Sequence, residues 1–113
     1  MIDRVASGVL ANALMRSAYA AGGSAAVLVK GDFTSGAILL VTAEKGVVQG
    51  FLARVHDRKG RYFWASKSPE LIENKQIIDD YIARERRRDP DMWVIELDVP
   101  NVQRFTAELA TGD

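Results

Sequence analysis

Apolar residues in the first part of the chain recur at the spacing of a helix. Gly22-Gly23 follows this stretch, and glycine is the residue at which helices commonly end. The pattern therefore predicts a first helix that turns an apolar stripe toward a core and ends at the double glycine. The predicted stripe consists of Val5, Val9, Leu10, Ala13, Leu14 and Ala18.

Beyond the double glycine the pattern changes to short, apolar, β-branched segments separated by turn signals. Residues 37–42 are apolar on both alternating faces, which is typical of a central strand covered on both sides. The connecting residues include Gly31-Asp32, Glu44-Lys45-Gly46 and the polar run 56–60, and connections this short favour antiparallel neighbours. We therefore predict an antiparallel meander, with strands at 25–30, 37–42, 47–55 and 61–65.

The last third of the chain carries helix signals followed by strand signals. Ser68-Pro69-Glu70 supplies an N-cap, a proline at the first helical position and an acidic first turn, and Asp89-Pro90 supplies the stop. A strand is predicted at 92–99, because one of its faces is apolar throughout. That face consists of Trp93, Ile95, Leu97 and Val99. Residues 102–105 are predicted to add an edge strand before a fraying tail.

These elements predict one domain, residues 1–113, of the α+β class. We expect a mostly antiparallel sheet of about five strands with two packed helices, in the order α-β-β-β-β-α-β. The sequence contains no internal repeat, linker or low-complexity tract.

Composition narrows the chemistry that this domain can perform. The 113 residues include no cysteine, which excludes disulfides, thiolate metal sites and a cysteine nucleophile. Fifteen basic residues balance fifteen acidic ones. This zero net charge argues against bulk electrostatic capture of nucleic acid, although a local patch stays open. No apolar run approaches the roughly 18 residues of a membrane span.

The first twenty residues imitate a secretory signal, because Ala18-Tyr19-Ala20 resembles a cleavage site. A signal peptide needs a positive start and an unbroken apolar stretch. Here Asp3 cancels Arg4, polar residues interrupt the stretch, and Arg16 stands just before the supposed site. We therefore predict a surface helix and a cytoplasmic protein.

Several segments together resemble one protein family. The most specific are Asp80-Tyr81-Ile82-Ala83-Arg84-Glu85 and Asp89-Pro90-Asp91-Met92-Trp93-Val94-Ile95-Glu96. Looser agreement is found at Leu14-Met15-Arg16 and at Val29-Lys30-Gly31-Asp32 with Gly36-Ala37-Ile38-Leu39. On these residues the chain resembles the short alphaproteobacterial proteins grouped as domain of unknown function 1491. The resemblance supports the fold and the bacterial location, and it implies no activity, substrate or catalytic residue.

Arg84, Arg86, Arg87 and Arg88 form the strongest local charge feature. Because the planar guanidinium fork matches carboxylates and phosphates, we interpret them as a contact surface for an anionic partner. A structural interpretation stays open, since cations in a last helical turn stabilise the helix. Asp80 can also pair with Arg84 four residues later. Nearby aspartates can neutralise the remaining charge: Asp89, Asp91 and Asp98.

Three other features favour structural interpretations. Tyr62 and Trp64 share a strand face that could stack bases, but the element order differs from the RNA-recognition fold and cross-strand packing is favoured. His56, the single histidine, lies in a charged turn and is predicted to be exposed. Asp89-Pro90-Asp91 is interpreted as a structural corner between a helix and a strand.

The favoured function is a non-enzymatic interaction or regulatory domain that docks an acidic protein through the arginine-rich helix end, with nucleic acid as the weaker choice. The alternative is a ligand-binding protein or small enzyme with a pocket between helix and sheet, lined by Tyr62, Trp64 and Trp93 and anchored by Arg61 or Arg84. A homodimer formed through an edge strand also stays open. No catalytic residue, metal or cofactor is predicted. The candidate binding residues are Arg84, Arg86, Arg87, Arg88, Arg61 and Trp64.

Overall fold

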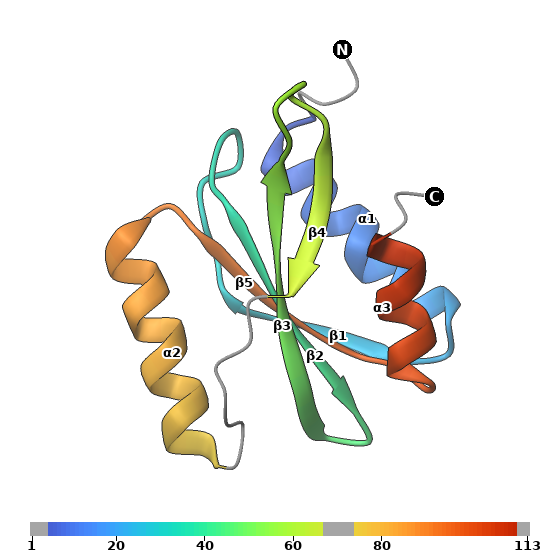
Figure 1. Cartoon of the computed structure of the whole chain (residues 1–113). Helices are drawn as coiled ribbons and strands as arrows, with labels where there is room; N and C mark the ends of the chain where they lie inside the picture. The colour runs from blue at the N-terminus through green and yellow to red at the C-terminus, as the bar shows by residue number, and fades with distance from the viewer. Residues whose placement is uncertain (1–4, 67–73, 111–113) are drawn as a thin grey trace.

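The computed structural model describes residues 5–66 and 74–110, which form one sheet and its covering helices (Figure 1). The predicted α+β class and the predicted order of the first seven elements are confirmed, and a further helix follows them. The elements are α1 (Ser7–Ala20), β1 (Ser24–Val29), β2 (Ile38–Glu44), β3 (Val47–His56), β4 (Tyr62–Ser66), α2 (Lys75–Arg88), β5 (Trp93–Asp98) and α3 (Val102–Ala110).

The five strands lie in the order β1-β5-β2-β3-β4. β5 pairs antiparallel with β1 and parallel with β2, while β2, β3 and β4 form the predicted antiparallel meander. The sheet is therefore mostly antiparallel, as expected, but the prediction that β1 and β2 are neighbours was wrong. The last strand is inserted between them.

The connection between β1 and β2 can pass the end of β5 because two glycines let it approach the backbone there. The N–H of Asp32 donates to the carbonyl of Asp91 at 2.9 Å, and the N–H of Trp93 donates to that of Ala37 at 2.7 Å. A Cβ atom on Gly31 or Gly36 would overlap the Asp91 carbonyl. The prediction of a turn was correct, but this turn carries the chain past β5 to β2 instead of joining two neighbouring strands in a hairpin.

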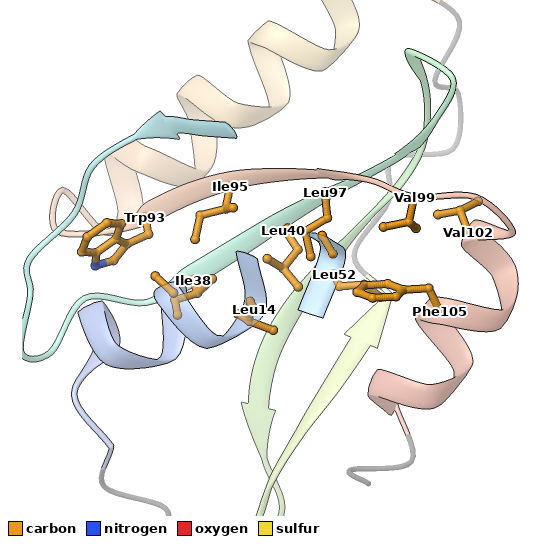
Figure 2. Packing of buried hydrophobic residues seen from close by; sticks show 12 residues of the cluster. Leu14, Ile38, Leu40, Leu52, Trp93, Ile95, Leu97, Val99, Val102 and Phe105 are labelled. Carbon is orange, nitrogen blue, oxygen red and sulfur yellow. The ribbon is translucent and has the colours of Figure 1, made fainter. Parts of the chain in front are cut away.

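Helices cover the two faces of the sheet unequally, with α1 and α3 on one face and α2 on the other (Figure 1). The first face carries the larger core, which runs from Trp93 at one end to Phe105 at the other (Figure 2). On the second face Tyr81 of α2 packs against Phe51 of β3, with ring centroids 4.7 Å apart. All strand residues of β2 before Glu44 are buried, as predicted for a central strand.

The apolar stripe predicted for α1 is confirmed at Leu14 and Ala18, but the buried side of the helix is rotated away from Val5 and Val9. Val5 and Val9 are 42% and 48% exposed. Small residues line the side that meets the sheet, because they let the helix backbone approach closely. The predicted stop is confirmed: Gly22 has φ of +89°, and the N–H of Gly23 donates to the carbonyl of Ala18 at 2.9 Å. The buried residues of α1 are Ser7, Gly8, Ala11, Leu14 and Ala18.

The edge strand predicted at 102–105 was also wrong, because these residues begin α3. Val102, Phe105 and Leu109 recur at helical spacing and pack into the larger core. The carboxylate of Glu44, at the end of β2, accepts the first helical N–H from Val102 at 3.0 Å. A partner far away in sequence therefore satisfies a helix end that local sequence left open.

The start proposed for α2 at Ser68-Pro69-Glu70 lies outside the described residues. As described, α2 begins at Lys75, and the side chain of Asn74 accepts the N–H of Ile77 at 3.0 Å. The helix ends before Asp89-Pro90, as predicted. The Asp89 carboxylate accepts the N–H of Asp91 at 3.0 Å and that of Ala37 at 3.3 Å. This corner is therefore structural.

Candidate functional site

The four arginines at the end of α2 do not share one surface. With about 3.6 residues per turn, Arg84 and Arg88 lie one above the other and Arg87 lies beside them, whereas Arg86 points to the opposite side. Exposure agrees, because Arg86 is half-buried while the other three are exposed. We call Arg84, Arg87 and Arg88 the arginine patch.

Few carboxylates neutralise the arginine patch. Arg88 contacts Glu85 with an N–O distance of 3.2 Å, and the Arg84 guanidinium lies 5.6 Å from the centroid of the Tyr81 ring. No carboxylate of the described residues forms an ion pair with Arg84 or Arg87. The predicted pairing of Asp80 with Arg84 is absent there, because Asp80 accepts a hydrogen bond from the Gln76 amide at 2.8 Å.

Two of the three aspartates that could have neutralised the cluster are engaged elsewhere, and Asp91 forms no ion pair with an arginine of the described residues. Asp89 holds the corner described above, and Asp98 accepts the N–H groups of Lys45 at 2.9 Å and Gly46 at 2.7 Å in the β2–β3 turn. These bonds fix loops and leave the end of α2 positively charged. Burial raises the pKa of the Tyr81 phenol and Glu85 raises it further, while Arg84 and Arg88 oppose this.

A second candidate site is a groove of about 280 Å³ on the face of the sheet that α1 and α3 cover. It lies where the two helices leave part of β3 and β4 uncovered, and we call it the aromatic groove. Its walls are mainly apolar, and Arg54 is its single charged residue. The lining residues are Leu10, Ala13, Leu14, Ser17, Arg54, Tyr62, Phe63, Trp64 and Leu109.

The sheet register brings the polar end of the aromatic groove together. Arg54 of β3 pairs with Trp64 of β4, and His56 pairs with Tyr62. The guanidinium carbon of Arg54 lies 3.9 Å from the centroid of the Tyr62 ring, and the His56 ring meets the same ring edge-on at 5.9 Å. Sequence reasoning missed Arg54. The signal was available, because Arg54 alternates with Ala53 and Val55 and so shares the core-facing side of Leu52.

The structure assembles only part of the pocket that the sequence predicted. Tyr62 and Trp64 line the aromatic groove together. Trp93 is buried at the far end of the core, where its indole N–H donates to the carbonyl of Asp32 at 2.7 Å. Arg61 forms an ion pair with Asp57 at 3.0 Å, and Arg84 lies on the helix that covers the opposite face.

Asp57 and Arg61 organise the turn between β3 and β4. The backbone N–H of Arg61, with that of Lys59 and the Arg61 side chain, holds the pKa of Asp57 below its ordinary value, although burial opposes this. Arg61 is therefore committed to the turn, and the predicted role as an anchor has no geometric support among these contacts.

A larger hollow, about 620 Å³, lies between the β2–β3 turn and the start of α3. It is shallow, and its lining includes Glu44, Lys45 and Asn101. Glu44 accepts the N–H of Val102, and the Asn101 side chain accepts that of Arg104 at 3.4 Å. Because these polar groups cap α3, we do not treat the hollow as the site.

The described residues contain no side-chain cluster typical of a metal site. No three His, Cys, Asp or Glu side chains cluster within residues 5–66 and 74–110. The hydroxyl of Ser7 donates to the carbonyl of Gly36 and that of Ser17 to Ala13, so neither faces a base. His56 is exposed, as predicted. None of the described helices is long and apolar enough to cross a membrane.

Comparison with known proteins finds a family model and solved structures that match this fold. The family model described as "Protein of unknown function (DUF1491)" matches residues 5–107. The solution NMR structure of a DUF1491 family protein from Caulobacter crescentus CB15 is 28% identical, covers 90% of this chain and 92% of its own, and has a TM-score of 0.73.

Two further solved structures are similar to this chain. A crystal structure of a DUF1491 family protein from Caulobacter crescentus CB15 is 29% identical over 80% of this chain and 84% of its own, with a TM-score of 0.69. The solution structure of protein Atu0922 from A. tumefaciens is 26% identical over 88% and 89%, with a TM-score of 0.72. No curated protein matches the chain. Since the family model spans nearly all of the domain that carries both candidate sites, this chain belongs to the DUF1491 family of proteins of unknown function.

Proposed function

We propose that this protein is a non-enzymatic interaction domain that docks an acidic protein through the arginine patch. The observation that carries the proposal is the shortage of carboxylates around the patch. Of the three patch arginines, only Arg88 has an ion-pair partner among the described residues, while Asp80, Asp89 and Asp98 accept other hydrogen bonds. A carboxylate-rich partner would supply the acceptors that the domain itself does not place there.

Helix stabilisation explains the position of these arginines but not all of their number. Cations in the last turn of a helix interact favourably with its dipole, typically by about 0.3–1 kcal/mol each. Arg84 lies a full turn before Arg88, where this effect has largely fallen off. Its exposed side chain is better explained by a contact outside the domain.

A protein partner fits the patch better than nucleic acid does. Proteins that hold duplex DNA electrostatically commonly make on the order of 6–10 phosphate contacts. The arginine patch offers three guanidinium groups, and the chain as a whole has no net charge. A short acidic segment, in contrast, needs only a few bidentate contacts to be held in register.

We also infer a cytoplasmic location. The segment that imitates a secretory signal forms α1, and Ala11, Leu14 and Ala18 of this helix are buried in the larger core. Cleavage after Ala20 would remove these residues and expose the apolar surface beneath them. This supports a role of the segment in the fold instead of in export.

Binding of a fluorescent oligoglutamate peptide tests the proposal. Arg84, Arg87 and Arg88 are replaced together by Glu, and affinity is measured by fluorescence anisotropy at low and physiological salt. We expect the affinity of the wild-type protein to fall with salt, and the variant to bind about tenfold more weakly or worse. An oligonucleotide of equal charge should bind more weakly than the peptide.

The matched control reverses three exposed cations elsewhere. Arg16, Arg58 and Lys59 are exposed and form no ion pair within the described residues, so replacing them by Glu changes the net charge equally. The control should keep most of the affinity. Equal losses in both variants would show a bulk charge effect and contradict the proposal, as would tighter binding of the oligonucleotide. Affinity capture with both variants and nuclease then identifies the natural partner.

A further inference from the structure

We infer that the aromatic groove is a binding site for a small monocarboxylate with a flat apolar body, whose carboxylate is held by Arg54. The site goes beyond the docking function, because it lies on the opposite face of the sheet from α2 and shares no residue with the arginine patch. No partner protein is needed to complete it.

Two helices and two strands build the groove, and their packing in the core fixes its shape. Leu10 and Leu14 of α1 and Leu109 of α3 form apolar walls, and all three pack into the larger core. Trp64 of β4 also lines the groove and is half-buried against the same core. Figure 1 shows α1 and α3 beside β4, where the sheet emerges from beneath the two helices.

The position of the Arg54 guanidinium in the groove is suited to binding an anion. Its side chain is half-buried, and its guanidinium is stacked 3.9 Å above the centroid of the Tyr62 ring. Stacking fixes the plane of the guanidinium and leaves the N–H groups at its edge free to point outward. No carboxylate of the described residues forms an ion pair with Arg54.

The chemistry of the lining selects the class of ligand. A single guanidinium can pair bidentately with one carboxylate, so a monoanion leaves no charge uncompensated. A phosphate monoester would bring a second charge beside apolar walls with no second cation to meet it. The Trp64 ring and the leucine side chains favour a flat, apolar body for the remainder of the ligand.

The size of the groove limits the ligand to a single-ring compound. Its volume of about 280 Å³ lies just below the range of about 300–1,000 Å³ of pockets that hold drug-sized molecules. Benzoate is the simplest probe with both required features. Benzamide has the same shape without the charge, and phenyl phosphate carries the second charge.

The two tryptophans provide the measurement. Trp64 lies in the groove, whereas Trp93 is buried elsewhere with its indole N–H bonded to the Asp32 carbonyl, so their side-chain N–H signals report separately. In ¹⁵N-labelled full-length protein we expect benzoate at millimolar concentration to shift the Trp64 signal and leave that of Trp93 in place. Arg54→Gln should weaken binding about tenfold or more, and Arg54→Lys should restore only part of it.

Controls make each outcome decisive. Arg16→Gln removes an exposed cation of α1 that does not line the groove, and it should leave benzoate binding unchanged. The Arg84/Arg87/Arg88 variant should also bind benzoate normally, which separates this site from the docking surface. Equal binding of benzamide, tighter binding of phenyl phosphate, undiminished binding by Arg54→Gln, or no shift of Trp64 would each overturn the assignment.

Discussion

The two faces of the sheet differ in how completely helices cover them. Among the described residues, twelve buried side chains form the core beneath α1 and α3, whereas six form the core beneath α2. Two helices meeting on one face seal most of it but leave the aromatic groove between them. The single helix on the other face uses only one side for packing, and its last two turns carry the arginine patch.

This comparison shows that each candidate site lies where packing stops. Arg54 follows Leu52 on the same side of β3, one step beyond the end of the buried region. Arg84 follows Tyr81 on α2 in the same way, just outside the side that meets the sheet. The core therefore positions the charged side chains at its edges, but its described residues include no carboxylate that could neutralise them.

The largest expected effect tests whether the face of the sheet that α1 and α3 cover, called here the two-helix face, supplies most of the stability. Leu14 is 4% exposed in the larger core, while Ile82 of α2 is only partly buried against the smaller one. Leu14→Ala should lower the free energy of unfolding by about 3 kcal/mol, and Ile82→Ala, which removes as many carbon atoms, by about half as much. Urea denaturation measures both, and an equal or reversed order would break the comparison.

A smaller effect tests the loop that closes one end of the two-helix face. A Cβ on Gly36 would meet the backbone carbonyl of Asp91, which cannot move without disturbing β5. Gly36→Ala should therefore cost about 2 kcal/mol of unfolding free energy. Gly8→Ala is the contrast, because the three atoms nearest to its Cβ all belong to the ring of Phe33, which is 54% exposed and can swing away.

For Gly8→Ala we expect a change near zero, since the better helix propensity of alanine, about 1 kcal/mol, offsets the displaced ring. Both values come from thermal and urea unfolding of the same protein preparations. If Gly36→Ala left the free energy of unfolding unchanged, the loop between β1 and β2 would not approach the Asp91 carbonyl this closely.

The smallest expected effect is a difference between the two faces in how pH changes the free energy of unfolding. Backbone N–H groups of Ser35 and Thr34 lower the pKa of Asp32 in the loop of the two-helix face, although burial opposes this. A carboxylate with a lowered pKa in the folded protein stabilises it above the unfolded value of about 3.9. That contribution is lost as the pH falls through the folded value, so Asp32→Asn should flatten the acid side of the stability profile.

Tyr81 acts in the opposite direction on the other face. Because burial raises its pKa, its neutral form stabilises the fold below the unfolded value of about 10. This contribution is lost as the pH rises through the folded value, and Tyr81→Phe should flatten the alkaline side. Stability measured from acid to alkaline pH checks both variants, and a variant that follows the wild-type profile would contradict its assignment.

Much of the candidate chemistry was visible in the sequence, but its arrangement was not. The arginine cluster was predicted as the main charge feature, yet helical geometry separates Arg86 from the other three. Tyr62 and Trp64 were predicted to share a face, and they do so in the groove. Arg54 was overlooked because it lines the groove that α1 and α3 leave uncovered, and the position of this groove depends on where the two helices end.

The sequence by itself determined the elements whose signals are local. The continuous apolar run of β2, the alternation along β5, the stop at Gly22-Gly23 and the turn at Glu44-Lys45-Gly46 depend on side-chain pattern and backbone preferences within a few residues. The tertiary structure decided the insertion of β5 between β1 and β2, the rotation of α1 and the helical state of residues 102–110. Each depends on a partner distant in sequence, such as the Asp91 carbonyl or the Glu44 carboxylate, because packing and hydrogen bonding between remote segments override weak local preferences.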